Sequence, residues 1–163
     1  MPKIVEKRRL TPITCLYRVD APLIARAAKA GQFVILRVRE GGERIPITIT
    51  DYDRESGLLT IVVQEVGATT RRLGELGEGD EILDMVGPLG EAPEIPSGGH
   101  IVGVGGGFGS AALLCLMKEL KARGEKTTFM IGSSEIDLLI LADVLAMLSG
   151  ILEICTYDGS AGF

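Results

Sequence analysis

Short apolar runs alternate with polar and turn residues over the first 96 positions of the chain. The runs fall at 10–19, 33–38, 45–50, 58–63 and 81–86, and the segments between them carry Gly, Asp, Glu and Gln. Short strands at this spacing are typical of a small antiparallel barrel or sandwich. One short helical pattern interrupts them at 69–76, before Gly77. We therefore predict an antiparallel β-barrel domain over residues 1–96.

From residue 100 onward the pattern changes to alternating strands and helices. We predict strands at 100–104, 127–131 and 151–156, and helices at 109–123 and 134–148. This alternation builds a parallel sheet covered by helices, as in doubly wound nucleotide-binding domains. A Pro- and Gly-containing linker precedes it, so residues 97–163 are predicted to form the N-terminal part of an α/β domain. Such sheets usually have about five or six strands, so three should leave part of one face uncovered.

Composition excludes several classes of function. Apolar residues make up 46% of the chain and charged residues 24%, and no run approaches the roughly 18 apolar residues of a membrane span. The N-terminus has no apolar run typical of a signal peptide, so we expect a cytoplasmic protein. The net charge is −5 and the basic residues are scattered, which argues against nucleic-acid binding.

The number and spacing of the cysteines and of the histidine argue against disulfides, metal sites and a Ser-His catalytic triad. Cys15, Cys115 and Cys155 are far apart, each within an apolar segment, and we expect buried thiols that form neither disulfides nor a metal site. His100 is the only histidine. The chain by itself therefore provides neither a Ser-His triad nor a histidine-rich metal site.

A glycine-rich turn between the first predicted strand and helix of the second half is the most informative segment. It comprises Gly105, Gly106, Gly107, Phe108, Gly109 and Ser110. Glycines let the backbone approach a pyrophosphate, and a helix N-terminus attracts its negative charge. Tight packing of a helix on a strand is the alternative reason for glycine here. Four glycines in five positions exceed what packing needs.

A second candidate anion site is the motif Arg44-Ile45-Pro46-Ile47-Thr48 at the start of a predicted strand. The guanidinium group of Arg44 can bind a phosphate with two hydrogen bonds, and the hydroxyl of Thr48 can bind a ring nitrogen. The alternative is that this motif only begins a strand.

Two further segments of the first half belong to this set of motifs, and each has a plain structural interpretation. Gly67, Thr69 and Thr70 precede the short helix, where amides and hydroxyls can hold an anion. They also fit a plain helix N-cap. The segment 87–90, Gly-Pro-Leu-Gly, fits a turn that closes the barrel.

The order of these four motifs resembles the ferredoxin-NADP reductase superfamily. Segments 21–25, 31–34 and 43–48 resemble one branch of it more narrowly. That branch holds the small subunit of NADH-dependent ferredoxin:NADP oxidoreductase, or sulfide dehydrogenase, and the electron-transfer subunit of dihydroorotate dehydrogenase. The resemblance implies an FAD-binding barrel of the Greek-key type, followed by a domain that binds NAD(H) or NADP(H).

The resemblance also implies roles for individual residues. Arg44 is expected to contact the FAD phosphates. Pro46, Ile47 and Thr48 are expected to line the isoalloxazine ring, with Thr48 as the candidate catalytic residue. Three residues are expected to hold the pyrophosphate: Gly67, Thr69 and Thr70. The turn from Gly105 to Ser110 is expected to bind the nicotinamide dinucleotide. Asp158, Gly159 and Ser160 match a family segment near the same site.

The chain departs from the family pattern in two ways, and a third feature bears on the nucleotide. Ile47 stands where the wider superfamily has an aromatic residue. The narrower branch shares this difference from the superfamily. Family members continue further and end in four cysteines that bind a [2Fe–2S] cluster, so the cluster is expected only in a longer form of the chain. Segment 132–135, after the second predicted strand of this half, lacks the Arg or Lys that a 2′-phosphate favours, which favours NAD(H).

Three hypotheses follow. The leading one is an electron-transfer flavoprotein subunit that moves electrons between a nicotinamide dinucleotide, FAD and a larger flavoprotein or iron–sulfur partner. Ferredoxin is a further candidate partner. The alternatives are an electron-transfer subunit of dihydroorotate dehydrogenase and a non-catalytic, flavin-binding assembly module.

Overall fold

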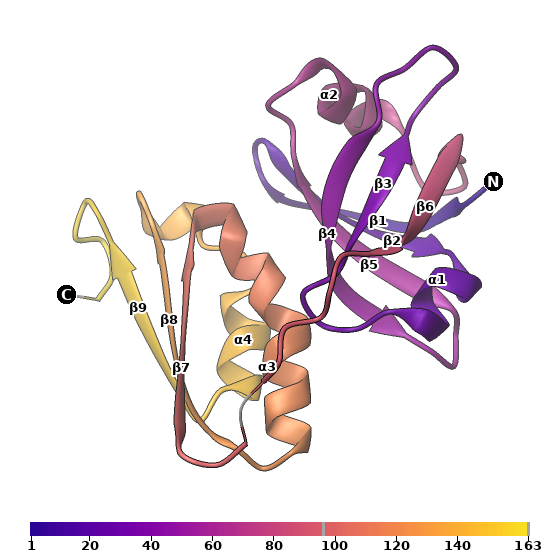
Figure 1. The fold of residues 1–163 in the computed structure, drawn as a ribbon. Coiled ribbons are helices and arrows are strands. Elements are labelled where there is room, and N and C mark those ends of the chain that lie inside the picture. Colours follow the sequence, from indigo (N-terminus) through magenta and orange to yellow (C-terminus); the bar gives the residue numbers. More distant parts are fainter. Residues whose placement is uncertain (96, 163) are drawn as a thin grey trace. The chain divides into compact units, whose positions relative to one another are not determined.

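The computed structural model describes residues 1–95 and 97–162 of the chain. These residues form two compact units, with the boundary between Ala92 and Pro93 (Figure 1). Pro96, the last residue of the predicted barrel domain, lies outside the described residues. The first unit is built mainly of strands, and the second combines strands with helices.

The first unit is an antiparallel sheet with two short helices. Its elements are β1 (Lys3–Thr11), β2 (Thr14–Asp20), α1 (Pro22–Ala27), β3 (Phe33–Arg37), β4 (Ile45–Asp53), β5 (Leu58–Gln64), α2 (Ala68–Glu75) and β6 (Asp84–Leu89). The strand order is β1-β2-β5-β4-β3-β6, and neighbouring strands are antiparallel. The N–H of Ile4 donates to the Asp80 carbonyl and that of Ile82 to the Pro2 carbonyl, both at 2.9 Å. These bonds join the start of β1 to the segment before β6, and the predicted antiparallel barrel is confirmed.

Inward-facing residues from four strands fill the core of this unit. Tyr17 of β2, Leu36 of β3, Ile49 of β4 and Ile61 of β5 are each 0% exposed. They come from strands that neighbour one another in the sheet, so strand pairing brings their side chains together. The apolar runs in the sequence are therefore the inner surface of the barrel.

Two strand predictions in this unit are wrong in their limits. The run at 10–19 is divided between β1 and β2, because Thr11 pairs with Thr14 across a tight turn. The last strand spans Asp84–Leu89 instead of 81–86. The chain just before it is bonded to the start of β1, so it forms the closure of the barrel.

The second unit is a three-stranded parallel sheet with helices on one face (Figure 1). Its elements are β7 (His100–Gly106), η1 (Gly107–Ala112), α3 (Leu113–Ala122), β8 (Lys126–Ser133), η2 (Ile136–Leu138), α4 (Ala142–Leu148) and β9 (Ile151–Thr156). The sheet order is β7-β8-β9. Leu120 of α3, Phe129 of β8 and Leu145 of α4 are fully buried and contribute to its core. The predicted α/β class is confirmed.

The other face of this sheet is apolar and exposed. Val102 and Val104 on β7 are 58% and 72% exposed, and Met130 on β8 is 41% exposed. In contrast, Phe129, the neighbour of Met130 on the opposite face, is fully buried. The expectation that three strands leave part of one face uncovered is met among the described residues.

The first predicted helix of this unit begins later than expected. A 3₁₀ helix occupies 107–112, and the α-helix starts at Leu113 rather than Gly109. Gly107 has a positive φ of 52°, and its carbonyl accepts a 2.7 Å hydrogen bond from the Ser110 hydroxyl. This local bond accompanies a turn tighter than an α-helix.

The prediction of one continuous helix over 134–148 is wrong. Only η2 and α4 are helical, and Leu141 between them has a left-handed φ of 58°. The carbonyls of Ser133 and Ser134 accept hydrogen bonds of 3.1 Å from the N–H groups of Tyr157 and Asp158. These contacts hold the chain beside the end of β9 and prevent the helix from starting there.

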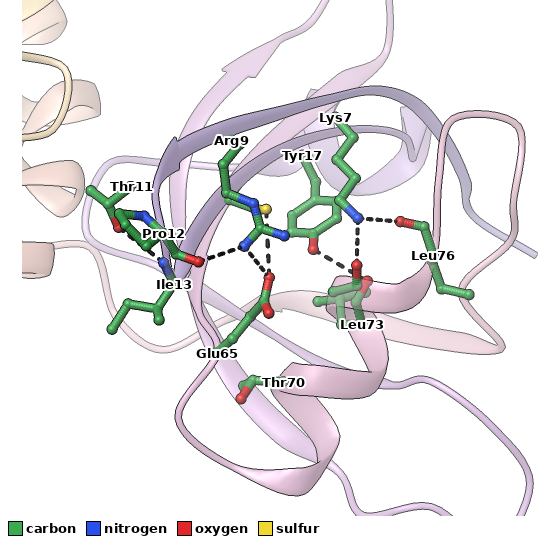
Figure 2. Close-up of polar contacts among 12 residues, drawn as sticks. Lys7, Arg9, Thr11, Pro12, Ile13, Tyr17, Glu65, Thr70, Leu73 and Leu76 are labelled. Atoms are coloured by element: carbon green, nitrogen blue, oxygen red, sulfur yellow. Dashed lines mark hydrogen bonds and ion pairs between the residues drawn. The ribbon is translucent and has the colours of Figure 1, made fainter.

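Tyr17 joins the barrel core to α2 (Figure 2). Its side chain is fully buried, and its hydroxyl donates a 3.2 Å hydrogen bond to the Leu73 carbonyl of α2. Burial, with a further contribution from Cys15, raises the pKa of Tyr17 above its ordinary value of 10.0. The phenol therefore stays protonated in the folded protein at pH values where it ionises in the unfolded chain.

This difference predicts a loss of stability at high pH. Above about pH 10 the unfolded chain binds fewer protons at this position than the folded protein, so the free energy of unfolding falls by about 1.4 kcal/mol per pH unit from this group. Tyr17→Phe should remove this part of the slope and lower stability near neutrality by roughly 0.5 to 1.5 kcal/mol, because one hydrogen bond is lost. Denaturant unfolding from pH 8 to 11 measures both. Tyr157→Phe is the control, because Tyr157 is 99% exposed; equal slopes for wild type and Tyr17→Phe would contradict the prediction.

Candidate functional site

Strand β4 divides the Arg44 motif between two faces. Alternate side chains of a strand point to opposite faces. Pro46 is exposed and Thr48 is half-buried, whereas Ile47 is only 9% exposed and belongs to the barrel core. Arg44 precedes the strand, and its side chain is 56% exposed. The outer face thus brings together Arg44, Pro46 and Thr48, and the Ile47 side chain lies on the other side.

Arg44 lies in a cluster with Arg37 and Asp84. Strand pairing places Arg37 of β3 opposite Asp84 of β6. The Asp84 Oδ2 atom is 3.3 Å from Arg44 Nη2 and 3.8 Å from Arg37 Nη2. The Nε atom of Arg37 is buried without a hydrogen-bond partner among the described residues. Two guanidinium groups thus share one carboxylate, and the cluster retains a positive charge that favours an anion.

The segment Gly67–Thr70 forms the start of α2. The Thr70 hydroxyl accepts a hydrogen bond from the Gly67 N–H (2.9 Å) and donates to the Gly67 carbonyl (3.0 Å). This hydroxyl is therefore engaged within the turn. The Thr69 hydroxyl donates to the carboxylate of Glu43 at 3.3 Å. Because Glu43 adjoins Arg44 in the chain, this contact brings the two predicted anion sites of the barrel together.

This arrangement fits a phosphate or pyrophosphate group. The first amides of a helix have no acceptor within the helix and carry partial positive charge. At α2 these amides lie near Glu43, the residue that precedes Arg44. Arg37 and Asp84 were not predicted as site residues, because only the pairing of β3 with β6 brings them beside Arg44.

The segment Gly87–Gly90 belongs to the barrel wall rather than to a separate turn. Its first three residues are part of β6, and the Gly87–Pro88 peptide is cis. A Cβ atom on Gly87 would lie 2.7 Å from Val34 Cγ1. The Gln32 side-chain amide donates to the Gly90 carbonyl at 2.8 Å. Packing against β3 thus accounts for Gly87.

The second unit has a cavity at the carboxyl ends of its strands. The cavity has a volume of about 630 Å³, and its walls come from the ends of β7, β8 and β9 and the residues that follow. Gly106 and Gly107 form one side, and Ser133 and Thr156 form others. Open α/β sheets bind their ligands at this end of the strands. The position of the cavity therefore matches the predicted nucleotide site.

The glycines of this turn differ in what surrounds them. A Cβ atom on Gly105 would lie 2.7 Å from Leu113 Cδ1 and 3.0 Å from the Ser110 Cα atom, so helix packing explains this glycine. A Cβ atom on Gly106 or Gly109 would meet no atom within 4 Å. Packing does not require these two glycines, and Gly106 lines the cavity.

The other two predicted residues of this turn have different environments. Phe108 is 39% exposed. Ser110 is buried, and its hydroxyl holds the Gly107 carbonyl. The Ser110 side chain therefore stabilises the turn, while the open backbone on the cavity side belongs to Gly106 and Gly107.

Asp158, Gly159 and Ser160 form a turn directly after β9. The Ser160 hydroxyl donates to Asp158 Oδ1 at 2.7 Å and accepts from the Ile136 N–H at 3.0 Å. The bonds from the Ser160 hydroxyl and N–H lower the pKa of Asp158 below its ordinary value, so its carboxylate is ionised at neutral pH. Tyr157, the residue before this turn, lines the cavity.

Cys155 differs from the expectation that all three cysteines are buried. Cys15 and Cys115 are buried, but Cys155 is exposed and lines the cavity. It points to the uncovered face of the sheet, where it pairs in register with Gly132. A Cβ atom on Gly132 would lie 2.8 Å from the Cys155 sulfur. The apolar pattern of β9 alone does not reveal which face is covered.

Residues 1–95 and 97–162 contain neither a helix that could span a membrane nor a cluster of metal-binding side chains. No helix in these ranges is long and apolar enough to cross a bilayer. No group of three or more His, Cys, Asp or Glu side chains in them is arranged to hold a metal ion.

Comparison with known proteins identifies relatives along nearly the whole chain. The dihydroorotate dehydrogenase B (NAD(+)) electron transfer subunit homolog of Thermotoga maritima is 42% identical over 160 residues, which cover 98% of this chain and 56% of the relative. The dihydroorotate dehydrogenase B (NAD(+)) electron transfer subunit of Desulforamulus reducens is 33% identical over 165 residues, covering 99% and 63%. The chain thus spans a little over half the length of these relatives. No protein-family model matches the chain.

A solved structure is similar to this chain over its whole length. The structure of NADH-dependent reduced ferredoxin-NADP oxidoreductase, described for flavin-based electron bifurcation, superposes with a TM-score of 0.94 at 40% identity. The match covers 100% of this chain and 59% of that one. The resemblance inferred from the order of the motifs is therefore confirmed: the chain is a homologue of dihydroorotate dehydrogenase B electron transfer subunits and has the fold of ferredoxin-NADP reductase-like proteins.

Proposed function

We propose that the chain binds FAD in its first unit and NAD(H) in its second, and forms the electron-transfer part of a larger cytoplasmic oxidoreductase. The observation that carries this proposal is the cluster in which Arg44 and Arg37 share the Asp84 carboxylate. The first turn of α2 lies near it, because Thr69 donates a hydrogen bond to Glu43, the residue before Arg44. The names of the relatives support an electron-transfer role.

In the barrel, each group has a separate task. Arg44 and Arg37 bind the phosphates, and the first amides of α2 donate to the pyrophosphate. Pro46 and Thr48 present the outer face of β4 to the flavin ring, where the Thr48 hydroxyl binds a ring nitrogen. When bound, the flavin supplies the capacity to accept a hydride and to release electrons one at a time.

In the second unit, the cavity at the ends of the strands receives the nicotinamide dinucleotide. The backbone of Gly106 and Gly107 allows the pyrophosphate to approach closely. The described residues that line this cavity include no Arg or Lys. A 2′-phosphate has no cationic partner there, and we therefore infer a preference for NAD(H) over NADP(H).

The partner is a larger subunit that carries its own redox centre. The relatives are named as subunits, and the similar solved structure is named for reduced ferredoxin and NADP. We therefore propose a flavoprotein or iron–sulfur partner, with ferredoxin as a further partner. A [2Fe–2S] cluster belongs to a longer form of the chain.

A second candidate function is electron transfer to a dihydroorotate dehydrogenase, which the names of the relatives favour. Affinity purification from the native cell, with identification of the stoichiometric partner, separates the two. We expect an iron–sulfur flavoprotein. Recovery of a dihydroorotate-oxidising flavoprotein would replace the leading proposal with the second one.

The flavin site predicts binding of FAD and its dependence on Arg44. The purified protein should be yellow or take up FAD, and Arg44→Ala should weaken FAD binding by roughly 1.5 to 3 kcal/mol, the contribution of a hydrogen bond to a charged group. Fluorescence titration measures the dissociation constant. Arg8→Ala is the matched control, because Arg8 is an exposed arginine on β1. A colourless protein that takes up no FAD would refute the flavin function, and normal binding by Arg44→Ala would remove Arg44 from the site.

The proposed nicotinamide site predicts different effects for substitutions at two neighbouring glycines: one should change NADH binding and the other thermal stability. Gly106→Ala should leave the melting temperature unchanged, since the new methyl group meets no atom within 4 Å, and should weaken NADH binding about tenfold by blocking close approach, a loss of about 1.4 kcal/mol. Gly105→Ala should lower the melting temperature, because its methyl group collides with Leu113. Calorimetric titration and thermal unfolding test the pair. Unchanged NADH binding by Gly106→Ala would count against the site.

A further inference from the structure

Side chains from β1 and β2 hold the last turn of α2 (Figure 2). The ammonium group of Lys7 donates to the carbonyls of Gly74 at 2.5 Å and Leu76 at 2.7 Å. The Tyr17 hydroxyl donates to the Leu73 carbonyl at 3.2 Å. The last carbonyls of a helix have no partner within it. Here two residues of the barrel wall donate to three carbonyls at the end of α2, and the Leu73 carbonyl also accepts a 3.1 Å hydrogen bond from the Leu76 N–H.

The segment that leads into α2 is also anchored. Glu65 directly follows β5, and its Oε1 atom is 2.6 Å from Arg9 Nη1. The Cys15 thiol donates to the same carboxylate at 3.7 Å. Figure 2 shows the Arg9 side chain directed to Glu65 and the Lys7 side chain directed to the end of α2. The barrel wall therefore fixes α2 at its C-terminal end and along the segment that enters it.

Gly74 allows α2 to lie directly against Glu65. A Cβ atom at position 74 would be 2.5 Å from the Glu65 carboxyl carbon. Glycine is among the least favourable residues inside a helix, so its presence near the end of α2 calls for a reason. Close approach to the Glu65 carboxylate, which Arg9 holds, provides that reason.

We propose that Lys7 is a positioning residue that aims the first turn of α2 at the FAD pyrophosphate. This inference rests on the proposed flavin function. The helix has 8 residues, about 12 Å of length, so a tilt at its C-terminal end moves the amides at its other end. The charge of Lys7 also complements the negative end of the helix dipole. Lys7 contacts 74 and 76, whereas the anion site lies at 67–70, so Lys7 acts through the helix and not on the ligand.

Lys7→Met tests this role, because methionine retains much of the side-chain length without the donors. We expect FAD binding to weaken about tenfold, equal to about 1.4 kcal/mol. Binding of riboflavin, which has no phosphate, should stay unchanged. Lys7→Arg should retain most of the FAD affinity, because a guanidinium group also donates to carbonyls. Lys3→Met is the control, since Lys3 is an exposed lysine of the same strand.

Hydrogen exchange in the protein without ligand provides an independent readout. In Lys7→Met, the amides of α2 should exchange faster, because the helix opens more often, while those of β5 keep their protection. Weaker FAD binding without faster exchange in α2, or an equal loss of FAD and riboflavin binding, would overturn the positioning role. Normal FAD binding by Lys7→Met would refute the role of Lys7 alone. Absence of FAD binding in the wild type would refute the proposed function and this role with it.

Discussion

The pairing of β3 with β4 on one side and β6 on the other is the constraint on which the proposed anion site depends. Backbone hydrogen bonds fix this register. A shift by one residue would turn every side chain to the opposite face. In the observed register, Arg37 and Asp84 lie opposite each other and Arg44 reaches the same carboxylate. The positive charge of the site is therefore a product of strand pairing between residues up to 47 positions apart, from 37 to 84.

Helix α2 acquires opposite environments at its two ends. Its C-terminal carbonyls meet the cation of Lys7 and the buried phenol of Tyr17. Its N-terminus lies near a hydroxyl and a carboxylate, those of Thr69 and Glu43. Both ends follow the charge preference of a helix dipole. A short helix would be marginal by itself, and here the barrel core and these contacts stabilise it.

In the second unit the candidate site is formed mainly by backbone geometry, whereas the candidate site of the barrel is formed mainly by charged side chains. The turn after β7 combines a glycine demanded by packing, Gly105, with one that packing does not demand, Gly106. The Ser110 hydroxyl stabilises this turn from within. The cavity at the ends of the parallel strands follows from this arrangement, since all three strands end at the same edge.

The sequence by itself determined the two fold classes, the order of the motifs and most of the apolar core, because periodicity records which side chains are buried. It also singled out Arg44, Thr69 and the glycine-rich turn as candidate site residues. It did not reveal the contacts of Arg37, Asp84, Lys7 or Glu65, whose partners are distant in the chain. The prediction of a helix at 134–148 was wrong for the same reason, because the carbonyls of Ser133 and Ser134, at the start of that segment, accept hydrogen bonds from residues after β9. Only the tertiary structure decided these features, since they depend on which distant strands become neighbours, as β3 and β6 do, and local sequence patterns do not specify the strand order.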